Sequence, residues 1–177
     1  MKLSSLKKYD SQKMFKIYDR WPDIAKEAYQ LDLKPISYTN VNNIIFSGMG
    51  GSGAIGDIFY SILSNAKIHV SLVKGYHLPS TVDSKTLIVT TSVSGNTVET
   101  LSILNAAKKL DCKILACSSG GKIEEFCNKN NIEYRKISKE DFQINDSESN
   151  DFWGSDFFNR FAIGDIDESN AKSVTIV

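Results

Sequence analysis

Cysteine and histidine are scarce in this chain of 177 residues. The three cysteines, Cys112, Cys117 and Cys127, leave an odd count and form no C-x-x-C pair, and neither of the two histidines stands near a cysteine. This spacing argues against a zinc site, so we predict no bound metal. Cys112 and Cys117 stand in or beside an apolar run, where cysteine acts as a small buried apolar residue. A reducing, cytoplasmic location is therefore expected.

Long apolar runs and an excess of one charge are also missing. No segment is long and apolar enough to span a membrane, and residues 1–8 lack the apolar core of a signal peptide. Lys and Arg together number 21, as do Asp and Glu, so the formal net charge is zero. We therefore expect neither a membrane nor a nucleic acid as a partner.

Glycine is concentrated in one place, between Gly48 and Gly56, where five of the eleven glycines fall. This stretch follows an apolar run at 43–46 and leads into a helical pattern from Asp57 to about Asn65. A strand, a glycine-rich turn and a helix in this order present backbone N–H groups to an anion. The P-loop motif G-x-x-x-x-G-K-[ST] is absent, so the stretch predicts a phosphate-bearing ligand of another kind.

The middle of the chain alternates between apolar runs typical of strands and helical patterns. The strand-like runs are 43–46, 67–73, 86–91, 112–117 and 132–137, and helical patterns fill 57–65, 98–110 and 122–129. This alternation predicts an α/β fold, a three-layer αβα sandwich around a five-stranded parallel sheet.

We expect three regions. Residues 1–42 are predicted to be a helical segment that packs on the domain, with an amphipathic helix over 11–31 that Pro22 interrupts. Residues 43–137 form the α/β domain. Residues 138–177 form an acidic linker and an aromatic tail of no assigned role. The aromatic cluster of that tail is Phe152, Trp153, Phe157, Phe158 and Phe161.

A second turn of small residues, residues 92–97, follows the third strand-like run; we call it the hydroxyl turn. Ser92, Ser94 and Thr97 place three hydroxyl groups around Gly95, directly before a helix, and this suits a phosphate dianion. In the flavodoxin-like strand order 2-1-3-4-5, the strands before the two turns are neighbours at the point where the order reverses. Both turns would then face one crevice.

Two other interpretations stay open from these residues. The hydroxyl groups can simply cap the helix, with Asn96 or Thr97 as the N-cap. In addition, residues 48–53 match the dinucleotide fingerprint G-x-G-x-x-G, although the acidic residue expected at the end of the second strand is missing. Lys74 stands there instead and is able to contact a 2′-phosphate, so an NADP-binding domain is a less favoured alternative.

Together, residues 48–53 and 92–100 resemble the sugar isomerase (SIS) domain. More narrowly, they resemble the N-terminal half of the bifunctional phosphoglucose/phosphomannose isomerases. Residues 74–79 and 119–122, and the pair Trp21-Pro22, fit the same pattern. The resemblance implies a flavodoxin-like SIS fold, a phosphorylated hexose as ligand, and no metal or organic cofactor. The substrate-binding residues that it implies are Gly50, Gly51, Ser52, Ser92, Ser94, Gly95 and Thr97.

The resemblance also implies a reaction, the interconversion of glucose-6-phosphate or mannose-6-phosphate with fructose-6-phosphate through an enediol. The family is about twice as long and has two SIS domains, and its catalytic glutamate, histidine and lysine come from the second half or from a partner subunit. The Pro-Arg pair that follows the first domain in the family is absent after residue 137. We therefore expect a truncated relative that supplies the phosphate-binding half, paired with a second SIS domain or in a homodimer.

The catalytic residues stay unassigned, and Glu99 and His77 are the weak local candidates. Glu99 stands in the first turn of the helix after the hydroxyl turn, where the helix dipole favours a carboxylate in any case. His77 stands in a loop, where a surface histidine is common. The alternative to an enzyme is a non-catalytic module that binds or senses a phosphosugar.

Overall fold

The computed structural model describes residues 34–137 continuously. It also describes residues 10, 15–16, 19–20, 22–23, 26 and 30 before them, and 163–166 and 174–176 after them. The predicted linker at 138–150 and the predicted aromatic cluster lie outside the described residues. Of the helix expected over 11–31, the described positions 15, 16, 19, 20, 22, 23 and 26 are helical.

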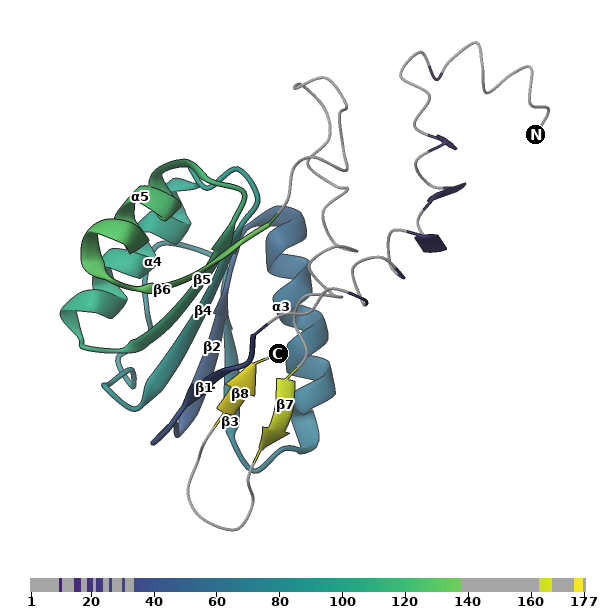
Figure 1. Cartoon of the computed structure of the whole chain (residues 1–177). Coiled ribbons are helices and arrows are strands. Elements are labelled where there is room, and N and C mark those ends of the chain that lie inside the picture. Colours follow the sequence, from purple (N-terminus) through teal and green to yellow (C-terminus); the bar gives the residue numbers. More distant parts are fainter. Residues whose placement is uncertain are drawn as a thin grey trace.

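A five-stranded parallel sheet forms the centre of the fold (Figure 1). Its strands lie in the order β3-β2-β4-β5-β6. This is the predicted order 2-1-3-4-5, with each label one higher because β1 belongs to another sheet. The strands are β2 (Asn43–Ser47), β3 (His69–Val73), β4 (Thr86–Ser92), β5 (Lys113–Ser118) and β6 (Glu133–Lys136).

Helices cover both faces of this sheet, which confirms the predicted αβα arrangement (Figure 1). The helices are α3 (Gly50–Ile62), α4 (Val98–Lys109) and α5 (Gly121–Asn130), and a short 3-10 turn, Leu63–Asn65, follows α3. On one face Phe59 of α3 stacks on Phe46 of β2, with ring centroids 5.4 Å apart. On the other face α4 and α5 bury Ile103, Leu104 and Ile123. All seven residues of β4 are buried, as expected for a central strand covered on both sides.

A second, antiparallel sheet lies on the α3 side of the main sheet (Figure 1). Its order is β1-β8-β7, with β1 at Ile36–Tyr38, β8 at Val174–Ile176 and β7 at Ile163–Ile166. The Tyr38 hydroxyl donates a hydrogen bond to the Ile114 carbonyl oxygen at 3.1 Å, which fastens β1 to the main sheet. These strands were not predicted from the sequence, because β1 pairs with a segment far along the chain.

The helix after the glycine stretch begins earlier than predicted, at Gly50 rather than Asp57. Four glycines thus lie inside α3, although glycine is a poor helix former. Close packing explains Gly56, where a Cβ atom would lie 3.0 Å from Leu72 Cδ2 and 3.1 Å from Phe46 Cβ. Glycine therefore lets the helix lie directly against β2 and β3.

No helix within the described residues is long and apolar enough to cross a membrane.

Candidate functional site

The two predicted turns leave the same edge of the main sheet. Ser47 at the end of β2 lies beside Thr90 of β4, and the parallel strand β4 continues to Ser92. The strand order reverses here, because the chain passes from β2 to β3 on one side and then to β4 on the other. The turn at residues 48–53, called the glycine turn, and the hydroxyl turn thus flank the switch point at which open α/β sheets bind ligands.

Tight backbone packing shapes the glycine turn. A Cβ atom on Gly48 would lie 2.9 Å from the Ser52 carbonyl oxygen, and one on Gly53 would lie 2.8 Å from the Gly48 oxygen. The Gly48 amide donates a hydrogen bond to the Val73 oxygen at 3.3 Å, which ties the turn to the end of β3. Gly50 has φ of 55°, a left-handed conformation that glycine adopts without strain. These glycines therefore set the path of the chain.

The start of α3 is electrostatically open to an anion. Its N-cap residue, Met49, makes no side-chain capping hydrogen bond, and the first turn holds no acidic residue. Gly50 and Gly51 are exposed and Ser52 is half-buried. The first amides and the positive end of the helix dipole are thus left without a local negative partner.

Lys74 borders this turn from the end of β3. Its ammonium group pairs with the Asp57 carboxylate at 2.5 Å, and its Cε atom lies 3.3 Å from the position of a Cβ atom on Gly53. Both side chains of the pair are nearly half exposed. The lysine that the NADP hypothesis assigns to a 2′-phosphate is therefore already paired with a carboxylate of α3.

A hydrogen bond between two of its own hydroxyl groups closes the hydroxyl turn. Ser92 Oγ lies 2.7 Å from Thr97 Oγ1, and Ser92 is only 2% exposed. The Gly95 amide donates to the Ser92 carbonyl oxygen at 3.0 Å, and φ of Gly95 is 66°. Ser94 is exposed at the tip of the turn. Ser92 therefore braces the turn from inside, while Ser94 faces solvent.

Thr97 is the N-cap residue of α4, but its side chain makes no capping hydrogen bond. Its hydroxyl group is bonded to Ser92 instead. This arrangement differs from the simple capping role that the sequence left open. As at α3, the N-cap side chain leaves the first-turn amides of α4 uncapped, but the first turn of α4 also holds Glu99.

The two weak catalytic candidates lie on two elements that contact each other: His77 on the loop after β3, and Glu99 on α4. The loop after β3 carries His77, which is exposed. The same loop docks on α4 through Tyr76, whose carbonyl oxygen accepts a hydrogen bond from Ser102 Oγ at 3.1 Å. The Glu99 hydrogen bond and negative charge raise the pKa of Tyr76 above its ordinary value. Glu99 therefore has a structural partner here.

No group of three or more potential ligands among the described residues is placed to hold a metal ion. The cysteines are free thiols: Cys117 and Cys127 are buried and Cys112 is half-buried. Burial raises the pKa of Cys117 to about 12 and the pKa of Cys127 to about 11. Both thiols are thus protonated and unreactive at neutral pH.

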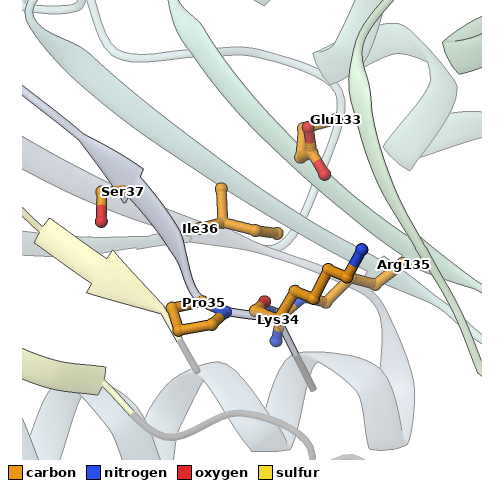
Figure 2. A pocket seen from close by; sticks show the side chains of 6 residues that line it. All are labelled: Lys34, Pro35, Ile36, Ser37, Glu133 and Arg135. Carbon is orange, nitrogen blue, oxygen red and sulfur yellow. The ribbon is translucent and has the colours of Figure 1, made fainter. Parts of the chain in front are cut away.

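A depression of about 520 Å³ lies elsewhere, between β1 and β6 (Figure 2). Arg135 Nη2 donates to the Lys34 carbonyl oxygen at 2.8 Å beside it. None of the predicted site residues lines this depression. Its lining residues are Lys34, Pro35, Ile36, Ser37, Glu133 and Arg135.

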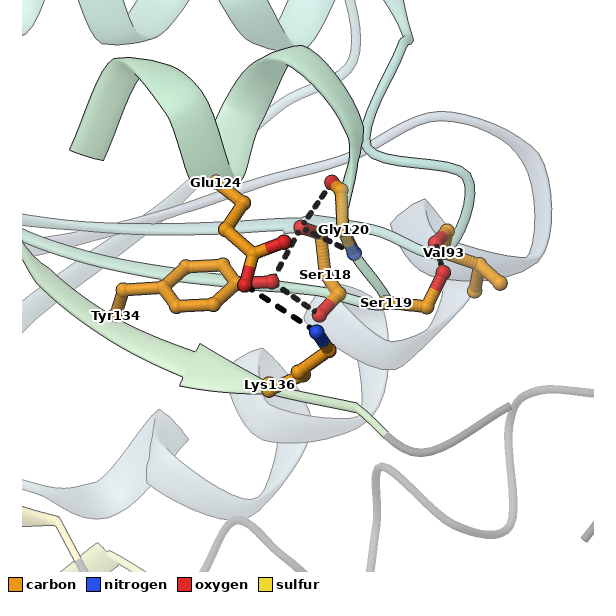
Figure 3. Close-up of polar contacts among 7 residues, drawn as sticks. All are labelled: Val93, Ser118, Ser119, Gly120, Glu124, Tyr134 and Lys136. Carbon is orange, nitrogen blue, oxygen red and sulfur yellow. Dashed lines mark hydrogen bonds and ion pairs between the residues drawn. The ribbon is translucent and has the colours of Figure 1, made fainter. Parts of the chain in front are cut away.

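A third turn, at residues 118–121, lies beside the hydroxyl turn, and none of its residues is among the predicted site residues. It follows β5 and packs directly against the hydroxyl turn. Its Ser119 hydroxyl group donates to the Val93 carbonyl oxygen at 2.5 Å (Figure 3). The small-residue run Ser118-Ser119-Gly120-Gly121 predicts a turn, and residues 119–122 fit the SIS pattern, but neither signal shows what the turn contacts.

Sequence comparison finds relatives that are phosphosugar enzymes, whereas no family model matches the chain. The bifunctional phosphoglucose/phosphomannose isomerase of Caldicellulosiruptor bescii is 37% identical over 125 residues, which cover 68% of this chain and 37% of that protein. The D-glucosamine-6-phosphate 4-epimerase of Sulfolobus acidocaldarius is 34% identical over 113 residues, which cover 63% of this chain and 35% of that protein. The match thus spans about a third of the length of these relatives.

Structure comparison supports the fold. A protein of Escherichia coli CFT073, solved in complex with a ligand, superposes with a TM-score of 0.54 at 16% identity, covering 77% of this chain and 74% of that protein. At this identity the likeness concerns the fold. The sequence similarity adds the enzyme class of the relatives: over 68% of its length, the chain is similar to a bifunctional phosphoglucose/phosphomannose isomerase, which confirms the resemblance that its two turns predict.

Proposed function

We propose that the chain binds a phosphorylated hexose across the carboxyl edge of the main sheet. The phosphate lies at the hydroxyl turn and the start of α4, and the sugar lies toward the glycine turn and the start of α3. The proposed ligand-binding residues are Gly50, Gly51, Ser52, Ser94 and Thr97, while the buried Ser92 and Gly95 shape the turn that presents them.

One observation carries this proposal: two helices without side-chain caps begin at neighbouring strands on the same sheet edge. Amides at such starts, together with the exposed Ser94 hydroxyl, suit a phosphate dianion. The names of the relatives agree on this ligand class and differ on the chemistry, since one is an isomerase and another an epimerase of a sugar phosphate. Phosphosugar binding is the property that these names share.

The reaction we propose is aldose–ketose isomerisation through an enediol, with this chain as its phosphate-binding part. The base and the ring-opening acid then come from a second SIS domain or from the partner subunit of a homodimer, in the cytoplasm. Two features support an external base: the Glu99 carboxylate interacts with Tyr76 and raises its pKa, and His77 lies exposed on the loop that carries Tyr76. The same two features support the second candidate, a module that binds a phosphosugar without turning it over.

Calorimetry with the purified chain tests the binding step. Glucose-6-phosphate and fructose-6-phosphate should bind, and unphosphorylated glucose should not. Ser94→Ala and Thr97→Ala should each weaken binding by about tenfold, because each removes a hydrogen bond to a charged group. Ser64→Ala serves as the control, because Ser64 is exposed in the 3-10 turn after α3, away from the proposed site. Binding of NADPH without binding of either sugar phosphate would overturn the proposal.

A coupled isomerase assay separates the two candidates. As a monomer, the purified chain should bind fructose-6-phosphate without turnover, and it should gain turnover when it dimerises or when a catalytic SIS domain is supplied. Turnover by the monomeric chain would contradict both the external base and the binding module.

A further inference from the structure

The hydroxyl turn does not stand alone but lies against the β5–α5 turn, residues 118–121. A Cβ atom on Gly95 would lie 1.7 Å from the Gly120 carbonyl oxygen, and one on Gly121 would lie 2.8 Å from the Ser94 oxygen. Both glycines have left-handed backbone conformations, with φ of 66° at Gly95 and 72° at Gly121. Glycine at both positions thus lets two backbone turns touch without side chains between them.

Hydrogen bonds join the two turns at both ends. The Ser119 amide and hydroxyl both donate to the Val93 carbonyl oxygen, at 3.0 and 2.5 Å. From the other side, the Ile123 amide donates to the Gly95 oxygen at 2.9 Å. The Ile123 amide in the first turn of α5 is therefore directed into the hydroxyl turn, whereas the N-cap side chain leaves the first-turn amides of α4 uncapped.

Asn96 links this contact to Ser94. Its Oδ1 atom accepts a hydrogen bond from the Lys122 amide at 3.2 Å, and its Nδ2 group donates to the Ser94 carbonyl oxygen at 3.1 Å. Its own amide donates to Ser94 Oγ at 3.2 Å. One side chain thus connects the start of α5 with the exposed serine at the tip of the turn.

Hydrogen bonds from side chains of β5 and β6 hold the β5–α5 turn in place (Figure 3). Ser118 Oγ donates to the Gly120 oxygen at 2.9 Å, and the Tyr134 hydroxyl donates to the Ser118 oxygen at 2.8 Å. Ser118 is fully buried. The surface on which the hydroxyl turn rests is therefore fixed by bonds to β5 and β6.

We propose that Ser119 and Asn96 are positioning residues of the sugar-phosphate site. Together they clamp the hydroxyl turn onto the β5–α5 turn and hold Ser94 in place for the phosphate. This inference rests on the function proposed above, since it concerns the geometry of the same site. Neither side chain is required to touch the ligand, because each acts through the backbone of the turn.

The test compares Ser119→Ala and Asn96→Ala with wild type by calorimetry with glucose-6-phosphate. Each should weaken binding about fivefold to tenfold, since each releases one anchor of the turn. Ser119→Thr keeps the hydroxyl group and should restore binding to within about twofold of wild type. Ser102→Ala is the matched control, because it removes a hydroxyl-to-carbonyl bond of the same kind on α4, outside the clamp.

Amide hydrogen exchange without ligand gives a second readout. Ser119→Ala should speed exchange at Gly95 and Ile123, and Ser102→Ala should not. If wild type and Ser119→Ala bind and exchange equally, while Ser94→Ala binds weakly, the clamp is wrong and the proposed function stands. If wild type itself binds no sugar phosphate, the proposed function fails and the positioning role fails with it.

Discussion

Ser92 Oγ and Thr97 Oγ1 lie 2.7 Å apart, so the first and last hydroxyl groups of the hydroxyl turn are bonded to each other. A sequence pattern of three hydroxyl groups predicts three equivalent phosphate ligands. The structure instead divides them, because Ser92 is buried and Ser94 is exposed. The turn is thus closed by one pair and leaves Ser94 at its tip.

Ser92→Ala should destabilise the fold, because it leaves the Thr97 hydroxyl group without this partner. We expect the free energy of unfolding to fall by about 1 kcal/mol. Urea denaturation followed by circular dichroism measures this, and Ser94→Ala is the control because its exposed hydroxyl group contributes little to stability. Equal unfolding midpoints for both variants would contradict the bracing role of Ser92.

Gly95→Ala should be far more damaging than an ordinary glycine substitution. The new Cβ atom would fall 1.7 Å from the Gly120 oxygen, at a backbone φ of 66° that alanine disfavours. We expect a loss of roughly 3 kcal/mol or more in the free energy of unfolding. Gly75→Ala is the matched control, because nothing lies within 4 Å of its Cβ position, and it should change stability by less than about 1 kcal/mol. A similar effect of the two variants would show that the turns are not in contact.

Glu99→Gln should lower the pKa of Tyr76 toward the ordinary tyrosine value. Hydrogen bonding to the Glu99 carboxylate favours the neutral Tyr76 hydroxyl group, and the carboxylate charge repels the phenolate, so both effects raise that pKa. An NMR titration of the Tyr76 ring reports the change, with Glu125→Gln, an exposed position on α5, as the control. An unchanged Tyr76 titration in Glu99→Gln would mean that Glu99 is free for another role.

Cys117 should make the fold less stable at alkaline pH. Burial raises the pKa of its thiol from 9.0 to about 12 in the folded chain, so between these values only the unfolded chain ionises. The contribution of the group is fully present below pH 9 and is lost as pH rises toward 12. From pH 8 to pH 10, the unfolding free energy of wild type should fall by about 1 kcal/mol more than that of Cys117→Ala. Parallel pH dependence of the two proteins would contradict this burial effect.

Local patterns were sufficient to predict the main sheet. The runs 86–91 and 112–117 became β4 and β5 with shifts of one residue at their ends, because apolar runs between turn residues mark covered strands. The start of α3 was misplaced, since glycine suppresses the helical pattern even where packing requires it. Residues 36–38 gave no strand signal, because their partner strand β8 lies more than 130 residues further along the chain.

The candidate site was predictable only in part, because some of its contacts depend on segments that are distant in the sequence. Hydroxyl groups and glycines near strand ends show which turns can meet an anion. They do not show that Ser92 bonds Thr97, or that Asn96 and Ser119 join two turns, because such contacts depend on tertiary packing. The two turns could be predicted from the sequence, whereas the hydrogen bonds that hold the hydroxyl turn in place could not.

The most direct test of the account is an NMR titration of the ¹⁵N-labelled chain with glucose-6-phosphate. The largest amide shifts should fall on residues 50–53 and 94–100, at the starts of α3 and α4, and unphosphorylated glucose should leave these residues unchanged. Shifts centred on Lys34 and Arg135, at the depression between β1 and β6, or no shifts at all, would contradict a phosphosugar site at the switch point of the main sheet.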